Sequence, residues 1–291
     1  MKVRCALVVL AGLQAAGSGL QEVVRKAPLF GVELRAAGDV DADGVGDFVI
    51  GDGGWSESGL KRAWWVVSGK SGAEIAAFLE EDGAANFPER VRAAGERDGD
   101  GAADLWLELK EKRVVLWSGK QRAVAREATE EERKLAFAEP TASDLNGDGV
   151  PDPLRVESGK SLILNGADET VLWQIERIYE RVVPLGRYGT QPKSALLCIN
   201  SRVGVAEGVV ELRTGDTAAE LWSISDSSFW YFGSLLEVIG DTNADGVNDF
   251  VVTGYHGRSH ENGKVQLRSG ANGSPLLEFT RANRSILRRP R

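Results

Sequence analysis

Short apolar runs separated by polar turns dominate the hydrophobic pattern of this chain. The runs are four to six residues long, rich in β-branched and aromatic residues, and too short and irregular in spacing for amphipathic helices. Five of them end in a Ser-Gly, Asn-Gly or Thr-Gly dipeptide, which marks a turn, and a second apolar run follows each turn. The pattern therefore predicts pairs of strands, the first member of each pair being 64–67, 114–117, 162–164, 209–213 and 265–268.

An acidic segment stands before four of these strand pairs and has one spacing throughout. Its copies begin at residues 39, 96, 144 and 241, so the last gap is about twice the others. The segment 186–199 fills that gap: it keeps the glycine before the loop and the apolar run after it, but carries no acidic residue. We number the repeats 1 to 5 and call the loops L1 to L5, with L4 the acid-free one. Each repeat reads as strand, loop, strand, variable loop, strand, turn, strand.

Repeats of four strands in about 50 residues are typical of propeller blades. We therefore predict an all-β fold, a β-propeller of about five four-stranded blades, with an acidic loop between the first two strands of most blades. The blades lie near residues 30–80, 88–128, 138–175, 181–225 and 231–280, within a propeller spanning 21–280. The segment Glu22–Arg25 is the candidate strand for closing the ring, and a partial propeller that closes against another chain is the alternative.

The two ends of the chain differ from the repeats. Lys2 and Arg4 precede an apolar run, Cys5–Leu13, and small residues follow, which favours a signal peptide over residues 1–20 and a secreted, periplasmic or extracellular protein. A buried first strand or helix is the other interpretation. The tail, 281–291, is rich in arginine and predicted to be disordered. No other segment is apolar for long enough to span a membrane.

The residue types of the acidic segment favour a hard divalent cation. Oxygen-bearing side chains stand at positions 1, 3, 5 and 9, around a glycine at position 6 that lets the loop double back. Two unit charges 4 Å apart repel by on the order of 4 kcal/mol at an effective dielectric constant near 20. Calcium would remove that repulsion, because it accepts many oxygen ligands in flexible geometry. The predicted ligands, for up to four Ca²⁺ ions, are Asp39, Asp41, Asp43 and Asp47 in L1, Glu96, Asp98, Asp100 and Asp104 in L2, Asp144, Asn146, Asp148 and Asp152 in L3, and Asp241, Asn243, Asp245 and Asp249 in L5.

The segment is not an EF-hand, because position 12 holds no glutamate. Over roughly residues 30–280 the chain instead resembles the FG-GAP repeat family, the integrin α-type propeller repeats also described as VCBS-like, and a bacterial secreted member in particular. Phe30-Gly31 and Phe232-Gly233 match the Phe-Gly of that family. The resemblance implies that the loop joins the first two strands of a blade and holds calcium. It also implies a ligand from the backbone carbonyl at position 7: Val45, Ala102, Val150 and Val247.

Some residues depart from the family pattern. Glu96 is longer than the aspartate expected at position 1, which predicts a looser site in L2. Pro151 and Pro153 flank Asp152 and speak against a strand directly after L3. In repeat 4, Arg187 and Lys193 stand at or beside the positions of the lost acids, which suggests fixed positive charge in place of an ion.

The remaining residues give little sign of catalysis. The net charge of −8 argues against a nucleic-acid partner, and no nucleophile motif, phosphate loop or zinc spacing is present. Cys198 lies in an apolar run and is expected to be a buried thiol. We therefore expect a non-enzymatic module for adhesion, binding or structural interaction, whose partner is a protein or a surface glycan. The alternative is a sugar-binding propeller or a calcium-dependent, polysaccharide lyase-like enzyme.

Two loops are the candidates for a contact surface outside the acidic segments. One contains His256 and His260, the two histidines of the chain, and the other contains Trp55 and Glu57. The first could bind a ligand or a transition metal, and an aromatic ring in the second could stack on a sugar. An exposed polar loop is the favoured interpretation of the histidine cluster.

Overall fold

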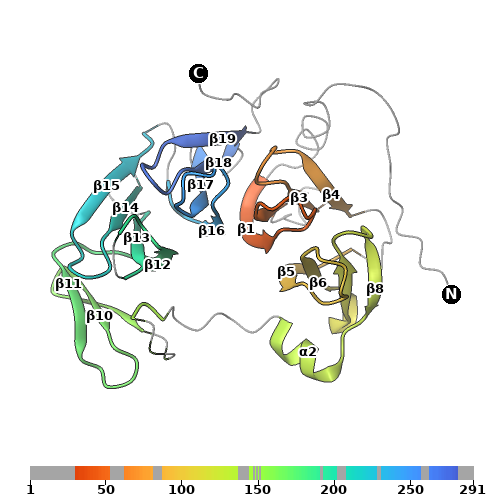
Figure 1. Ribbon diagram of the computed structural model, residues 1–291, viewed down its shortest axis with the longest axis horizontal. Coiled ribbons are helices and arrows are strands. Elements are labelled where there is room, and N and C mark those ends of the chain that lie inside the picture. The colour runs from red at the N-terminus through yellow and green to blue at the C-terminus, as the bar shows by residue number, and fades with distance from the viewer. Residues whose placement is uncertain are drawn as a thin grey trace. The chain divides into compact units, whose positions relative to one another are not determined.

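The structure is a computed structural model that describes residues 30–52, 62–80, 87–136, 144–146, 148, 150, 152–190, 193–201, 208–227, 231–256 and 262–280. These residues form five antiparallel sheets and almost no helix (Figure 1). The prediction of an all-β fold made of five strand-rich repeats is therefore confirmed. The predicted signal peptide, the strand Glu22–Arg25, the tail, and the candidates Trp55, Glu57 and His260 lie outside the described residues.

Four sheets contain four strands each, and neighbouring strands follow one another in the chain. The strands are β1 (Phe30–Gly38), β2 (Asp47–Asp52), β3 (Ala63–Val67) and β4 (Glu74–Leu79) in repeat 1; β5 (Arg90–Gly95), β6 (Asp104–Glu108), β7 (Val114–Ser118) and β8 (Ala123–Glu127) in repeat 2; β12 (Arg181–Gly186), β13 (Ala195–Asn200), β14 (Val209–Arg213) and β15 (Glu220–Ser225) in repeat 4; and β16 (Leu236–Gly240), β17 (Asp249–His256), β18 (Asn262–Arg268) and β19 (Pro275–Thr280) in repeat 5.

The sheet of repeat 3 has three strands among the described residues, β9 (Leu154–Glu157), β10 (Lys160–Leu164) and β11 (Val171–Ile175). The prolines, which spoke against a strand directly after L3, delay the strand without removing it, because β9 begins immediately after Pro153 and not at Asp152. The carbonyl of Pro153 even accepts a hydrogen bond from the Leu164 N–H at 3.0 Å. A short helix, α2 (Glu130–Ala136), and a 3₁₀ turn, η2 (Lys110–Lys112), were not predicted.

The strand register confirms that L4 occupies the same place as the acidic loops. In each of the four four-stranded sheets, a glycine at the end of the first strand pairs with position 9 of the loop. Position 9 is also the first residue of the second strand. The pairs are Gly38 with Asp47, Gly95 with Asp104, Gly186 with Ala195, and Gly240 with Asp249. All four glycines have positive φ, a conformation that a residue with a Cβ rarely adopts. Repeat 4 therefore keeps the loop length although it has lost the acids and the glycine of position 6.

The chain divides into two compact units, one ending at Ala138 and the other running from Glu139 to Thr280. In the first unit, apolar side chains of repeats 1 and 2 share one core that includes Val66, Trp64 and Trp117. In the second unit, β13 is buried on both faces: Leu197 and Ile199 pack toward repeat 5, and Leu196 and Cys198 toward repeat 3. Sheets whose two faces are both covered by neighbouring sheets are the packing that stacked blades require.

Candidate metal-binding loops

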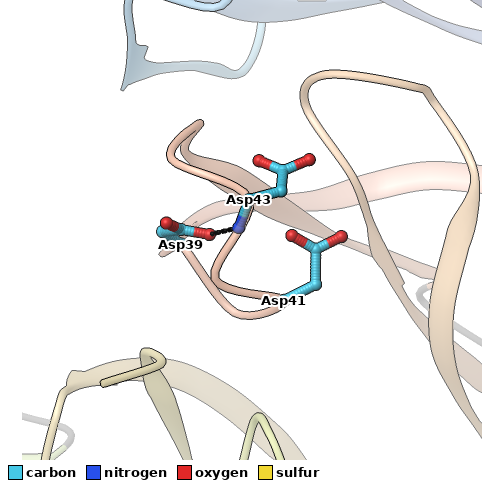
Figure 2. Close-up of side chains that lie close together, drawn as sticks. All are labelled: Asp39, Asp41 and Asp43. Atoms are coloured by element: carbon cyan, nitrogen blue, oxygen red, sulfur yellow. Dashed lines mark hydrogen bonds between the residues drawn. The ribbon is translucent and has the colours of Figure 1, made fainter.

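L1 brings three of its predicted ligands together. Asp39, Asp41 and Asp43 each offer a carboxylate oxygen, and these oxygens lie within 4.8 Å of one another (Figure 2). The Asp39 carboxylate also accepts hydrogen bonds from the N–H groups of Asp43 at 3.0 Å and Gly44 at 2.8 Å. These bonds fold the loop around its first carboxylate, and Gly44 adopts the predicted left-handed conformation, with φ of 87°.

Asp41 is the side chain of L1 whose bonding is incomplete. Its Oδ1 atom is buried and accepts no hydrogen bond from the described part of the chain. Burial raises the pKa of the Asp41 carboxyl, and the neighbouring charge of Asp43 raises it further. A buried carboxylate oxygen without a partner carries a large desolvation cost, which a bound cation would offset. The geometry of L1 therefore fits a hard cation.

L2 forms a second cluster, in which Glu96, Asp98 and Asp104 place oxygens within 4.8 Å of one another. The longer side chain of Glu96 reaches back into the loop and accepts a hydrogen bond from the Gly99 N–H at 2.6 Å. Asp100 instead accepts bonds from the Ala102 N–H at 3.0 Å and the Ser118 hydroxyl at 3.0 Å. The Ala102 N–H bond, with smaller contributions that include Lys120, holds the pKa of Asp100 below its usual range.

L3 and L5 have asparagine at position 3, and its amide makes hydrogen bonds that an aspartate could not. Asn243 donates to Asp245 at 2.9 Å in L5, and Asn146 donates to Asp148 at 2.9 Å in L3. Asp241 in L5 accepts the N–H groups of Asp245 and Gly246, as Asp39 does in L1. L5 therefore repeats the fold of L1 with one negative charge fewer.

The aspartate at position 9 has a role that the sequence did not reveal. In all four acidic loops one of its oxygens accepts the N–H of position 2, and the other accepts the N–H of the glycine in the turn between the third and fourth strands. For Asp47 the donors are Val40 at 2.7 Å and Gly69 at 3.0 Å. The same pair of bonds is made by Asp104, with Arg97 and Gly119, by Asp152, with Leu145 and Gly166, and by Asp249, with Thr242 and Gly270.

This carboxylate is therefore a latch that joins the acidic loop to the next turn of the same sheet, whatever else it binds. Asp47, Asp104 and Asp249 have no exposed surface. Burial raises the pKa of all three, and that of Asp47 to about 7, against the two N–H bonds that lower it. The sequence shows both the turn glycine and the aspartate of position 9, but no local signal indicates that the two meet.

L4 has Ala195 at position 9 and makes none of these bonds. Instead, the Ser194 hydroxyl accepts a hydrogen bond from the Gly186 N–H at 2.9 Å. The Nζ of Lys193 lies over the ring of Trp173, 5.8 Å from the ring centroid, and the role suggested for its charge stays a prediction. The role suggested for Arg187 stays a prediction.

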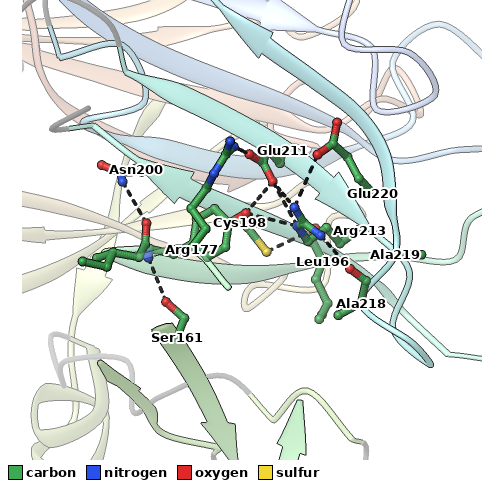
Figure 3. Close-up of polar contacts among 12 residues, drawn as sticks. Ser161, Arg177, Leu196, Cys198, Asn200, Glu211, Arg213, Ala218, Ala219 and Glu220 are labelled. Carbon is green, nitrogen blue, oxygen red and sulfur yellow. Dashed lines mark hydrogen bonds and ion pairs between the residues drawn. The ribbon is translucent and has the colours of Figure 1, made fainter. Parts of the chain in front are cut away.

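Repeat 4 also contains a buried ionic cluster that sequence reasoning missed. Glu211, on β14, has no exposed surface and forms ion pairs with Arg213 and Arg177 (Figure 3). The Tyr179 hydroxyl donates a hydrogen bond to the same carboxylate. Arg177 and Tyr179 belong to the segment between β11 and β12, so the cluster ties that segment to the middle of the sheet.

Cys198 is a buried free thiol, as predicted, and burial raises its pKa to about 12. Neither property suits a nucleophile. Trp117 and Trp173 are buried in the cores between sheets, and Trp222 packs partly buried against another of these cores. No described helix is long and apolar enough to cross a membrane.

No family model matches the chain, and no curated protein matches its sequence. A crystal structure of BBS1N in complex with ARL6DN, soaked with mercury, is similar with 10% identity and a TM-score of 0.31, covering 87% of this chain and 82% of that chain. Sqt1 from Saccharomyces cerevisiae is similar with 10% identity and a TM-score of 0.29, covering 80% and 58%. Rhamnogalacturonan lyase YesW is similar with 14% identity and a TM-score of 0.23, covering 85% and 51%. These scores are low, so no property of these proteins is carried over.

Proposed function

We propose that this chain is a calcium-stabilised β-propeller that acts as a secreted, non-enzymatic module for binding a protein or a surface glycan. The observation that carries the proposal is L1, where three carboxylates converge and the buried Oδ1 of Asp41 accepts no hydrogen bond from the described residues. The other acidic loops repeat its spacing between the first two strands of their sheets, or before β9 in repeat 3.

The donor chemistry favours calcium among the common metals. All predicted side-chain ligands are carboxylate or amide oxygens, which suit hard cations and not zinc or copper. The residue types of the predicted ligands vary between the loops, because position 1 is aspartate or glutamate and position 3 is aspartate or asparagine. Calcium accepts such variation more readily than magnesium, which demands near-octahedral geometry. When bound, the ion would supply the positive charge that the clustered carboxylates lack.

The propeller is proposed from the way the sheets repeat. Each repeat leads from strand to strand in chain order, and neighbouring sheets within a unit share apolar cores. A sheet with apolar residues on both faces must be covered on both sides, and stacking around an axis does this for every blade. Closure of the ring and the number of blades in it are part of this proposal.

A role in binding is favoured over catalysis by what the loops do with their charges. Both carboxylate oxygens of the aspartate at position 9 accept backbone N–H groups and hold the loop in place, so the loop is part of the scaffold. A rigid scaffold that presents variable loops is the usual basis of a binding surface.

Calcium-dependent stability tests the metal part of the proposal. Thermal unfolding should be measured with EDTA, with calcium and with magnesium, for the wild type and for Asp41→Ala. We expect calcium to raise the Tm of the wild type well above its value in EDTA, magnesium to raise it less, and Asp41→Ala to lose part of the calcium response. Arg187→Gln, in the acid-free L4, should keep the full response. Equal Tm values in EDTA and calcium would overturn the proposal.

Binding to a glycan array and a screen for unsaturated products on a polysaccharide panel test the other part. The proposal expects calcium-dependent retention of glycans or of a protein ligand, without turnover. Release of unsaturated sugars would instead show a lyase.

A further inference from the structure

Two lysines place ammonium groups on the acidic loops of repeats 1 and 2. Lys70 Nζ donates a hydrogen bond to the backbone carbonyl of Asp43 at 3.0 Å and lies 4.0 Å from the carboxylate of the same residue. Lys120 Nζ donates to the backbone carbonyl of Asp100 at 2.7 Å. Asp43 and Asp100 are both position 5 of their loops, so the two contacts are equivalent.

The repeat itself sets this geometry. Lys70 and Lys120 directly follow the turn glycines, Gly69 and Gly119, whose N–H groups bond the aspartate at position 9. The latch therefore fixes the backbone from which each lysine reaches the loop. The corresponding residues are Ala167, Asp216 and Ala271 in repeats 3, 4 and 5.

The lysines occur in the two loops that carry an extra acid. L1 and L2 have aspartate at position 3, Asp41 and Asp98, whereas L3 and L5 have asparagine there. With every carboxylate counted as ionised, the four carboxylates and one lysine of L1 give a charge of −3, which the three carboxylates of L3 and L5 give alone. L2 has the same four carboxylates and one lysine, and Arg97 within the loop brings its count to −2. At L5 the side chains that donate to the Asp245 carboxylate are neutral: the hydroxyl of Ser269 at 3.0 Å and the amide of Asn243 at 2.9 Å.

We propose that Lys70 and Lys120 are counter-ions to the fourth carboxylate of their loops and set the calcium affinity of L1 and L2. Each ammonium holds its loop together when no cation is bound and opposes the cation when one enters. This inference rests on the proposed function, since it concerns the affinity of the same loops. It goes further than that function, because the two lysines are not among the predicted ligands.

Coulomb's law gives the size of the effect. A unit positive charge about 6 Å from a divalent ion, in a medium close to water, changes the affinity by up to about tenfold. Salt at physiological strength screens part of this interaction, because Lys70 is more than half exposed. We therefore expect a change of about threefold to tenfold for one loop, larger at low ionic strength.

The experiment is calcium titration of the full protein against a chromophoric chelator at low salt. Lys70→Gln should tighten binding at one site by about threefold to tenfold, and Ala271→Lys should weaken one site by a similar factor. The double variant Lys70→Gln with Asp41→Asn restores a charge of −3 in the pattern of L5 and should bind close to the wild type.

Lys193→Gln is the matched control, since it removes the same charge from the acid-free L4 and should leave every calcium affinity unchanged. Circular dichroism and unfolding in EDTA show whether each variant folds. If Lys70→Gln binds calcium no more tightly than Lys193→Gln, the counter-ion role is wrong while calcium binding stands. If the wild type binds no calcium, the proposed function itself is wrong.

Discussion

The latch at position 9 predicts that one aspartate of L1 stabilises the fold without any cation. Asp47→Ala removes a fully buried carboxylate whose two oxygens accept the N–H groups of Val40 and Gly69. Both N–H groups would then be buried without an acceptor, at about 1–3 kcal/mol each. Burial already opposes ionisation of Asp47, and losing that carboxyl recovers part of the cost. We therefore expect a net loss near the lower end, about 2 kcal/mol.

Asp43→Ala is the control within the same loop. Asp43 belongs to the carboxylate cluster of L1. Its carboxylate lies near the surface and accepts one backbone N–H bond, from Val45 at 2.9 Å. Removing it should cost less than about 1 kcal/mol in EDTA, because water can replace that bond. In calcium the stability loss of Asp43→Ala should grow relative to that of Asp47→Ala, because Asp43→Ala should also lose the stabilisation that the ion provides to L1.

The assay is unfolding by guanidinium chloride in EDTA and again in calcium, followed by tryptophan fluorescence and far-ultraviolet circular dichroism. Asp47→Ala should shift the midpoint in EDTA clearly further than Asp43→Ala does. Equal midpoints for the two variants in EDTA would refute the latch, because the two N–H bonds of Asp47 would then contribute nothing that Asp43 does not.

Three further outcomes follow from single features of the structure. Ala42 and Ala244, at position 4 of L1 and L5, have positive φ of 57° and 62°, so replacing either with glycine should stabilise the protein by about 0.5–1 kcal/mol in thermal unfolding. The Cys198 thiol, buried and with its pKa raised to about 12, should react with a disulfide reagent only at the rate of unfolding, and fast labelling of the native protein would contradict the burial. In EDTA, the free energy of unfolding should fall as pH rises from about 5 to about 7.5, because folded Asp47, with its pKa raised from 3.8 to about 7, holds a proton that the unfolded chain releases. Saturating calcium should flatten this dependence in the same guanidinium chloride titrations.

The repeat pattern predicted the sheets well because each repeat shows the same local signals. A strand pair around a Ser-Gly, Asn-Gly or Thr-Gly turn recurs five times, and the acidic spacing recurs four times. The strand register of repeat 4 confirms the predicted place of the acid-free L4. The left-handed glycine at position 6 also followed from local chemistry, and Gly44, Gly101 and Gly246 all have positive φ.

Contacts between distant segments could not be predicted in this way. The bond from Gly69 to Asp47 joins residues 22 positions apart, and only the folded sheet brings them together. Helix α2 is different, because its signal was present and overlooked. Thr129 and Glu132 form a capping box, in which the Glu132 N–H donates to Thr129 Oγ1 at 3.2 Å and the Thr129 N–H to the Glu132 carboxylate at 2.9 Å.

Repeat 4 is the repeat whose loop lacks both the predicted cation ligands and the latch. It has lost the cation ligands and the latch together, which is expected if one loop geometry serves both. Its turn still packs against the loop so closely that a Cβ on Gly215 would lie 2.0 Å from the Ser194 carbonyl oxygen. In the middle of the same sheet, Glu211 forms ion pairs with Arg213 and Arg177. Because that pairing needs no ion, chelation should loosen the acidic loops and leave repeat 4 the last of the sheets to respond.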